Sequence, residues 1–505
     1  MGVAVPVSEA LARKLLQGYE SERPPTEEEY RTALHAEGLD DVDSALRTGR
    51  FLPPQGLQWD SGPYRHQGEA VRAWESNGER GVLAVATGGG KTICSLVAAS
   101  RLADRLEKLF VLVSAPTKPL VSQWAGEMRE FGLEPYVQSS GRRSDENAAR
   151  IDARMTAVQR GLAAVDSAVV THDLLTSEAM RLVLRRHAGY VLLIGDEAHN
   201  LGSERFLADP PDVRFRLGLS ATPERQYDPE GTAELFAYFG GVVYEFGLDR
   251  AIELCLVPYD YFIHESYLSP DEMERYRELS MEIRTLYARL GNAASDSVQL
   301  QLKLFKRRGL LESAVGKIGV LRSCLLQMEV RDIRHTLIYT TDKNPDQLVQ
   351  VNALLRELGI RFHQLTQEET QEADLVADLV ARFRAGQIQV LTAKRVLDEG
   401  FNIPEIATAY ILASTTVERQ WTQRRGRILR LCPAIGKTNA TLHDVIALPP
   451  VEEGVDEDVQ RLVSGELLRV DEFARLSSNK HARSGAYSWY QDASLEYRVW
   501  VNEEE

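Results

Sequence analysis

Three glycines, a lysine and a threonine follow one another in the segment ATGGGKT, between a strand-like run and a helix-like run. Glycines let successive backbone N–H groups turn inward onto phosphate oxygens, and the first turn of the next helix adds partial positive charge. Lys91 would contact the β- and γ-phosphates of a nucleotide, and the Thr92 hydroxyl would bind Mg²⁺. Val85 stands where the strict pattern has glycine, so this is the shorter, alanine-led variant. The residues expected to hold the phosphates are Thr87, Gly88, Gly89, Gly90, Lys91 and Thr92.

Two adjacent carboxylates end a second apolar run, in the segment LLIGDEAHN. Asp196 would hold Mg²⁺ through water, and Glu197 would orient and deprotonate the water that attacks the γ-phosphate. A third segment, LSATPER at 219–225, places small hydroxyl side chains after a strand, where they can sense the γ-phosphate. Together the three segments predict hydrolysis of ATP with Mg²⁺.

A further candidate segment is QWTQRRGRILR, residues 420–430, where four arginines are interleaved with apolar side chains. A helical face that buries the apolar residues would bury guanidinium groups beside them, and an unpaired buried charge is costly. An anionic partner is therefore expected for some of these arginines. They are Arg424, Arg425, Arg427 and Arg430.

These residues need a scaffold that brings the ends of several strands together. From about 80 to 255, short runs that are apolar on both faces alternate with helix-like stretches. That alternation predicts a parallel sheet covered by helices on both faces. The same pattern returns from about 335 to 450. We expect an α/β fold with two parallel-sheet lobes and a cleft between them.

The remaining segments divide the chain further. We expect a small helical segment at 1–55, the first lobe at 56–260 and the second at 334–450. A charged stretch with helical spacing at 261–333 predicts a helical insert between the lobes. The acidic and then aromatic segment at 451–505 forms a tail.

Composition limits the class of protein. The chain has 505 residues and a formal net charge of −15, which disfavours a nucleic-acid partner without excluding one, because a basic cleft can coexist with an acidic exterior. No apolar run approaches the roughly 18 residues of a membrane span, and no signal peptide is recognised, so we expect a cytoplasmic protein without a membrane partner. The cysteines are too far apart for a zinc ribbon or an iron–sulfur cluster. They are Cys94, Cys255, Cys324 and Cys432.

The order of three segments resembles the motifs of superfamily 2 DEAD/DEAH-type helicases and translocases. The segments are ATGGGKT, LLIGDEAHN and LSATPER. Further segments match the same family. PYRHQ at 63–67 resembles the adenine-side motif, APTKPLVSQW at 115–124 motif Ia, and VVTHDLL at 169–175 motif Ib. HTLIYTTD at 335–342 resembles motif IV, and VLTAKRVLDEGFNIPE at 390–405 motif V. Motif VI is matched by Gln423, Arg424, Gly426, Arg427 and Arg430.

The resemblance implies two RecA-like lobes and assigns further roles. Gln67 is expected to contact the adenine base, and Asp398 and Gly400 occupy usual motif V positions at the nucleotide site. Arg427 and Arg430 would reach the triphosphate from the second lobe and act as arginine fingers. Arg424 or Arg425 can instead pair with an acid. The residues at motif Ia and Ib positions expected to touch the nucleic-acid backbone are Thr117, Lys118, Thr171 and His172.

The segments GRILR, LSATPER and FNIPE are most similar to XPB-type and type III restriction-like DNA helicases. Two departures stand against the XPB type: the Arg-Glu-Asp element after motif III is absent, and residues 1–55 are too short for a damage-recognition region. The insert at 261–333 resembles the thumb or clamp of such proteins. Its basic residues would grip nucleic acid, or would simply form a solvated basic helix face. They are Lys306, Arg307 and Arg308.

We therefore expect an ATP-dependent DNA helicase or translocase, acting on duplex or single-stranded DNA in repair, restriction or antiphage defence. The alternatives are a nucleoprotein remodeller that moves on duplex DNA without unwinding it, and an RNA helicase. An ATP-binding scaffold is disfavoured because the catalytic residue types are present. No nuclease motif is found, since the His-Asp dipeptides lack the further histidine ligands of a phosphohydrolase. A nuclease or another system subunit is therefore a candidate partner.

Overall fold

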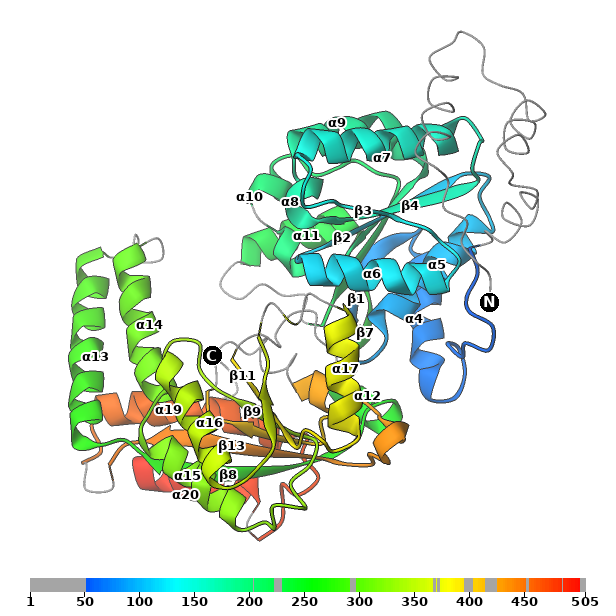
Figure 1. The fold of residues 1–505 in the computed structure, drawn as a ribbon. Coiled ribbons are helices and arrows are strands. Elements are labelled where there is room, and N and C mark those ends of the chain that lie inside the picture. Colours follow the sequence, from blue (N-terminus) through cyan, green and yellow to red (C-terminus); the bar gives the residue numbers. More distant parts are fainter. Residues whose placement is uncertain are drawn as a thin grey trace.

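The computed structural model describes most of the chain after residue 50. Two α/β lobes lie one above the other in Figure 1. The predicted helical segment at 1–55 falls almost wholly outside the described part. The described residues are 51–202, 204–221, 229–290, 297–366, 369, 373–394, 403–413, 425–450, 454–483 and 485–499.

The described part of the first lobe contains a seven-stranded parallel sheet in the order β3-β4-β2-β5-β6-β1-β7. The central strands β2 and β5 are buried along their whole length, as expected for a parallel sheet with both faces covered. The strands are β1 (Arg80–Val85), β2 (Leu109–Ala115), β3 (Tyr136–Val137), β4 (Val165–Thr171), β5 (Val191–Gly195), β6 (Phe215–Ser220) and β7 (Val242–Phe246).

Helices connect these strands and cover the sheet (Figure 1). Helix α5 begins at Lys91, directly after β1, so its N-terminus points at the carboxyl edge of the sheet. The α-helices are α4 (Arg65–Ser76), α5 (Lys91–Ala103), α6 (Lys118–Glu130), α7 (Ser144–Gln159), α8 (His172–Leu175), α9 (Glu178–His187), α10 (Glu204–Leu207), α11 (Pro229–Phe239) and α12 (Leu248–Leu254). The 3₁₀ turns are η1 (Gly62–Tyr64), η2 (Ala188–Tyr190) and η3 (Ala198–Leu201).

The second lobe, as far as it is described, holds a six-stranded parallel sheet in the order β10-β11-β9-β12-β13-β8. The predicted α/β class with two parallel sheets is therefore confirmed. The strands are β8 (Tyr259–Tyr267), β9 (Thr336–Tyr339), β10 (Phe362–Gln364), β11 (Val390–Ala393), β12 (Thr408–Ile411) and β13 (Ala440–Leu448). The helices after β7 that belong to this half are α13 (Pro270–Leu290), α14 (Val298–Glu312), α15 (Gly316–Leu326), α16 (Pro345–Glu357), α17 (Ala373–Arg384), η7 (Pro433–Ile435), α19 (Glu457–Ala474) and α20 (Ala486–Tyr497).

The expected insert at 261–333 is only partly separate from the second sheet. Strand β8 pairs with β13 along its whole length, from Tyr259 to Tyr267. Helices α13 and α14 form a hairpin that projects away from the sheet (Figure 1), whereas α15 packs against β8 and β13. We therefore propose that the second lobe begins near Tyr259 and that the insert proper is the α13–α14 hairpin.

The lobes touch where the chain passes from one to the other. Leu256 forms an antiparallel bridge with Arg430, and the backbone N–H of Val257 donates to Leu429 at 2.8 Å. A methyl group added at Gly426 would lie 2.7 Å from the Thr87 carbonyl oxygen, so only glycine permits this approach of the two backbones. The segment of arginines is thereby held against residues 86–92, the expected phosphate loop.

Among the described residues, no helix has the length and hydropathy needed to cross a bilayer.

Candidate functional site

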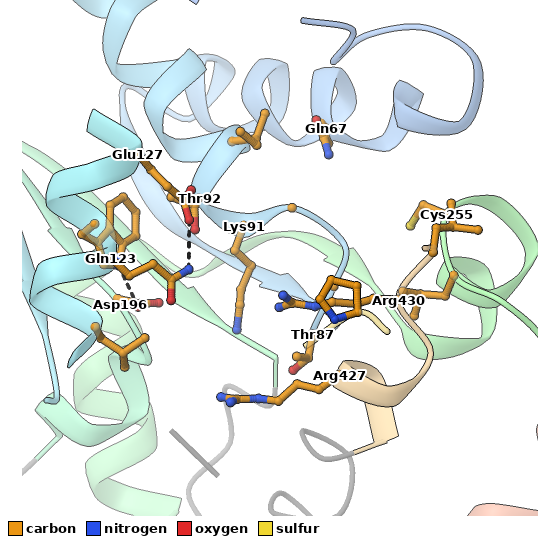
Figure 2. Close-up of a pocket in the computed structure, with 18 of the residues that line it drawn as sticks. Gln67, Thr87, Lys91, Thr92, Gln123, Glu127, Asp196, Cys255, Arg427 and Arg430 are labelled. Carbon is orange, nitrogen blue, oxygen red and sulfur yellow. Dashed lines mark hydrogen bonds between the residues drawn. The ribbon is translucent and has the colours of Figure 1, made fainter. Parts of the chain in front are cut away.

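A cavity of about 370 Å³ lies at the junction of the two lobes. The first lobe contributes the loop before α5, the residues after β5 and one face of α6; the second contributes Arg427 and Arg430. Figure 2 shows Lys91 and both arginines pointing into this cavity from different elements. The cavity thus gathers cations from both halves of the protein.

The loop between β1 and α5 has the backbone geometry that its glycines allow. Gly88 and Gly90 adopt φ angles of 91° and 86°, in the left-handed region. A Cβ at Gly90 would lie 2.3 Å from the Gln67 amide nitrogen, and one at Gly88 would lie 2.8 Å from Leu256. The loop is therefore closed tightly on both sides, and glycine is required for its conformation and for its packing.

Helix α4 holds this loop from the side. The Nε2 atom of His66 lies 2.7 Å from the Gly89 carbonyl oxygen, and Gln67 Nε2 donates to the same oxygen at 3.4 Å. The His66 ring stacks on Phe246 with centroids 3.9 Å apart. Burial lowers the pKa of His66, so a neutral ring fits the site. Gln67 is predicted from the sequence, whereas His66 is not.

The two carboxylates after β5 lie at the base of the cavity. Asp196 Oδ1 accepts from the Glu197 backbone N–H at 3.0 Å, and Lys91 donates to Glu197 Oε1 at 3.1 Å. Glu197 adopts φ 44°, an unusual value for a residue with a side chain. Strained backbone of this kind persists where the surrounding structure holds it, often at functional sites.

The charges of this pair are set by burial and by the neighbouring lysine. Burial, together with the Glu197 charge, raises the pKa of Asp196 to about 6. Burial would also raise the pKa of Glu197, but Lys91, His199 and Arg427 lower it below its ordinary value. Glu197 is therefore the member of the pair held as a carboxylate, which is the form that can accept a proton.

The arginines of the segment 420–430 differ in what they contact. Arg427 and Arg430 line the cavity. Burial and the nearby Arg427 charge lower the pKa of Arg430 to about 10, although the Glu127 charge acts in the opposite direction. Arg425 instead is fully buried and donates to Glu472 Oε1 at 2.5 Å, so the acid-pairing alternative holds for this residue.

The lining of the cavity is suited to a polar ligand, as the sequence predicts. Buried atoms without a hydrogen-bond partner remain on four residues of its wall: Gln67 Oε1, Thr87 Oγ1, Glu197 Oε2 and Arg430 Nε. An unsatisfied buried polar atom costs about 1–3 kcal/mol, so a polar ligand there is favoured. The Thr92 and Asp196 side chains line the same cavity and provide the oxygen ligands that Mg²⁺ prefers.

The residues expected to touch nucleic acid in the first lobe lie at one edge of its sheet. Thr117 and Lys118 follow β2, Thr171 is the last residue of the neighbouring strand β4, and His172 follows it. Lys118 is exposed, whereas Thr171 is buried, caps α8 and donates to Gln138. Lys118 is thus the member of this group best placed to meet a phosphate.

The basic residues of α14 are not equally available. Lys306 is exposed. Arg307 donates to Ser280 Oγ at 3.2 Å and lies over the Tyr276 ring, and Arg308 pairs with Glu312 at 2.8 Å. Arg307 therefore contacts the partner helix α13, Arg308 forms an ion pair within α14, and Lys306 alone of the three is exposed.

Some predicted residues lie outside the described part of the chain, and some described residues escaped prediction. Asp398, Gly400, Gln423 and Arg424 belong to the first group. Trp124 and Glu127 of α6, which line the cavity, were missed because only the fold brings α6 to the residues that follow β5. His199 was also missed, although it stands two residues after Glu197, and its Nδ1 lies 2.9 Å from Ser220 Oγ.

Comparison with known protein families agrees with this architecture. Residues 60–225 match the family described as "Type III restriction enzyme, res subunit". Residues 316–432 match "Helicase conserved C-terminal domain". The first match contains the phosphate loop and the carboxylates, and the second contains the arginines.

Similar proteins carry related names. DNA 3'-5' translocase XPB2 of Sulfurisphaera tokodaii is 26% identical over 387 residues, covering 72% of this chain and 78% of that protein. Putative DNA 3'-5' helicase Rad25 of Haloarcula marismortui is 25% identical over 356 residues, covering 69% of this chain and 48% of that protein. The structure of the type ISP restriction-modification enzyme LlaBIII bound to DNA has the same fold, with a TM-score of 0.57 and 14% identity over 89% of this chain and 33% of that one. The chain is a superfamily 2 helicase related to the XPB and type III restriction proteins.

Proposed function

We propose that this protein is an ATP-dependent DNA helicase or translocase that couples hydrolysis of Mg²⁺-ATP to movement on DNA. The observation that carries the proposal is the convergence of Lys91, Arg427 and Arg430 on one cavity. Lys91 belongs to the first lobe and the arginines to the second, so a triphosphate held there would contact both. Its hydrolysis would change the attraction between the lobes, which is what movement along a polymer requires.

Each residue of the cavity has a defined task in this scheme. The glycine loop and Lys91 would hold the β- and γ-phosphates. Mg²⁺, bound through Thr92 and Asp196, would supply charge neutralisation at the phosphate oxygens. Glu197 would take the proton of the attacking water. Arg427 and Arg430 would stabilise the charge that develops as the γ-phosphoryl group leaves.

DNA is the proposed polymer because of the relatives. The printed names of XPB2 and Rad25 assign DNA to those proteins, and LlaBIII was solved with DNA. The exposed Lys118 and Lys306 are the described basic residues proposed to meet its phosphates. A role in repair, restriction or antiphage defence, and a nuclease or other subunit as partner, remain part of the same proposal.

The direct test is the ATPase rate of the purified protein with duplex DNA, single-stranded DNA and RNA measured side by side. We expect DNA to stimulate turnover and RNA to have little effect. Stimulation by RNA alone would replace the proposal with an RNA helicase. Strand-displacement and triplex-displacement assays then separate a helicase from a remodeller, because only the former displaces a paired strand.

Replacing Lys118 or Lys306 by Ala is expected to weaken DNA binding and to flatten its salt dependence. Each lost phosphate contact lowers the slope of log affinity against log salt by about one. Lys108→Ala is the matched control, because Lys108 precedes β2 at the opposite edge of the sheet and donates to the Gln159 carbonyl. A slope for both variants equal to that of the control would remove these lysines from the DNA surface.

A further inference from the structure

A buried tryptophan reaches the carboxylate that is expected to hold Mg²⁺. The indole N–H of Trp124 donates to Asp196 Oδ2 at 2.8 Å. The two side chains are 2% and 8% exposed, so this hydrogen bond is shielded from water. Trp124 lies on α6, and Asp196 follows β5, 72 residues further along the chain. Neither the phosphate loop nor the arginines take part in this contact.

The hydrogen bond fixes the orientation of the carboxylate. The other oxygen of Asp196 accepts from the Glu197 backbone N–H, so each carboxylate oxygen has one fixed donor. Each oxygen keeps a further acceptor position, which can face the cavity. Rotation of the carboxylate about its bond to Cβ would break the bond with Trp124. The position of α6 therefore determines how Asp196 is presented.

Helix α6 begins at the surface that is expected to meet DNA. Its N-cap is Thr117 and its first residue is the exposed Lys118, less than two turns before Trp124. A shift of the helix on contact with a phosphate at Lys118 would move the indole with it, because a helix this short moves as a rigid rod.

A second path joins the same two sites. The backbone N–H of Asp196 donates to the Ser114 carbonyl oxygen at 2.8 Å. The side chain of Ser114 hydrogen-bonds with His172 Nδ1 at 2.7 Å, and His172 opens α8 at the same edge of the sheet. Burial lowers the pKa of His172 to about 4, so the ring is neutral at pH 7. The Asp196 backbone is thereby anchored, so the orientation of its carboxylate depends on the donors to its two oxygens.

We propose that Trp124 is a positioning residue that orients Asp196 for Mg²⁺ and transmits contact of DNA with the start of α6 to the nucleotide site. This inference rests on the function proposed above. It predicts that loss of the indole N–H weakens the response to Mg²⁺ and to DNA, while binding of nucleotide through the glycine loop and Lys91 stays intact.

The test uses Trp124→Phe, which keeps an aromatic ring and removes the donor. The matched control is Trp74→Phe, because Trp74 is also fully buried in the first lobe and its N–H donates to the Arg216 carbonyl at 2.9 Å, away from the cavity. Binding of a non-hydrolysable ATP analogue is titrated with Mg²⁺ and repeated in EDTA. Turnover is then measured with and without duplex DNA.

We expect Trp124→Phe to need about tenfold more Mg²⁺ for half-maximal analogue binding, the usual effect of removing a partner of a metal ligand. The affinity in EDTA should match wild type, and stimulation of kcat by DNA should fall about tenfold. Trp124→His keeps a ring N–H and should restore part of the Mg²⁺ response, although imidazole fills the space less well than phenyl. A packing role alone would give the opposite order.

The positioning role of Trp124, the coupling to DNA and the proposed function are each contradicted by a different result. Equal Mg²⁺ requirements for Trp124→Phe and Trp74→Phe would overturn the positioning role, and a raised requirement with a wild-type DNA response would overturn the coupling. If Trp124→Phe does not fold, Trp124→His against Trp74→His decides the same questions. A wild-type protein without DNA-stimulated ATPase activity would instead contradict the proposed function.

Discussion

Replacing Glu197 by Gln is expected to lower ATP turnover by on the order of 10³-fold and to leave ATP binding at least as tight as in wild type. A positioned general base contributes about 10²–10⁴-fold to rate, and an amide cannot accept the proton of the attacking water. Glu197 is held as a carboxylate beside Lys91, with a contact of 3.1 Å. Without nucleotide, the Glu197 carboxylate pairs with Lys91. Replacing this carboxylate by a neutral amide weakens that pairing and leaves Lys91 free to bind the nucleotide.

The measurement is a steady-state ATPase rate together with direct binding of labelled ATP. Glu134→Gln provides the same chemical change on the surface of the same lobe, where the carboxylate pairs with Arg129 and its side chain is 73% exposed. That variant should behave as wild type. Turnover by Glu197→Gln within a few-fold of wild type would remove Glu197 from the role of general base, and a large loss of ATP binding would show that it acts in holding the nucleotide.

Local sequence signals were sufficient for the phosphate loop. Glycines, a lysine and a threonine between a strand and a helix specify their own geometry, and Gly88 and Gly90 take the left-handed angles that they permit. The same holds for Asp196 and Glu197, because a polar pair after a fully apolar run marks the carboxyl end of a buried parallel strand. These segments are short, and the groups that act together are close in sequence.

The contacts that the sequence did not reveal join distant segments. From its type and its position on α6, Trp124 is expected to be an ordinary core residue. Three neighbours on the same helix are core residues: Val121, Ala125 and Met128. Only the pairing of β2 with β5 brings its N–H to Asp196. Likewise the partner of β8 is β13, which lies about 180 residues later in the chain, so only the fold places β8 in the second sheet.

Runs of like charge were also ambiguous from sequence. Lys306, Arg307 and Arg308 form one basic run, but a helix turns each residue by 100° from the last, so successive side chains face different neighbours. Two of them point at the partner helix and at Glu312, which the run itself does not indicate. The arginines of the segment 420–430 differ for the same reason.

The different surroundings of Arg425 and Arg430 lead to the second prediction with a large expected effect. Arg430→Ala is expected to lower turnover by about 10³-fold or more, the usual contribution of an arginine that stabilises a leaving phosphoryl group. Arg430→Lys should remain well below wild type, because a lysine ammonium lacks the planar pair of donors that matches phosphate oxygens. Folding should be little affected by Arg430→Ala, because removal of this buried guanidinium relieves its desolvation and its repulsion from Arg427.

Arg425→Met is the matched variant. Arg425 lies five residues before Arg430, but its guanidinium is paired with an acid and does not line the cavity. The Arg425 guanidinium is 1% exposed, lies over the Phe473 ring and donates to both the carboxylate and the backbone carbonyl of Glu472. Removing one member of a buried ion pair costs about 3–5 kcal/mol, so this variant should lose stability. Urea denaturation and ATPase rates, measured on both variants, should therefore give reversed orders. Arg430→Ala with wild-type turnover would show that Arg430 does not act on the phosphate. A loss of stability equal to that of Arg425→Met would show that Arg430 has a structural role like that of Arg425.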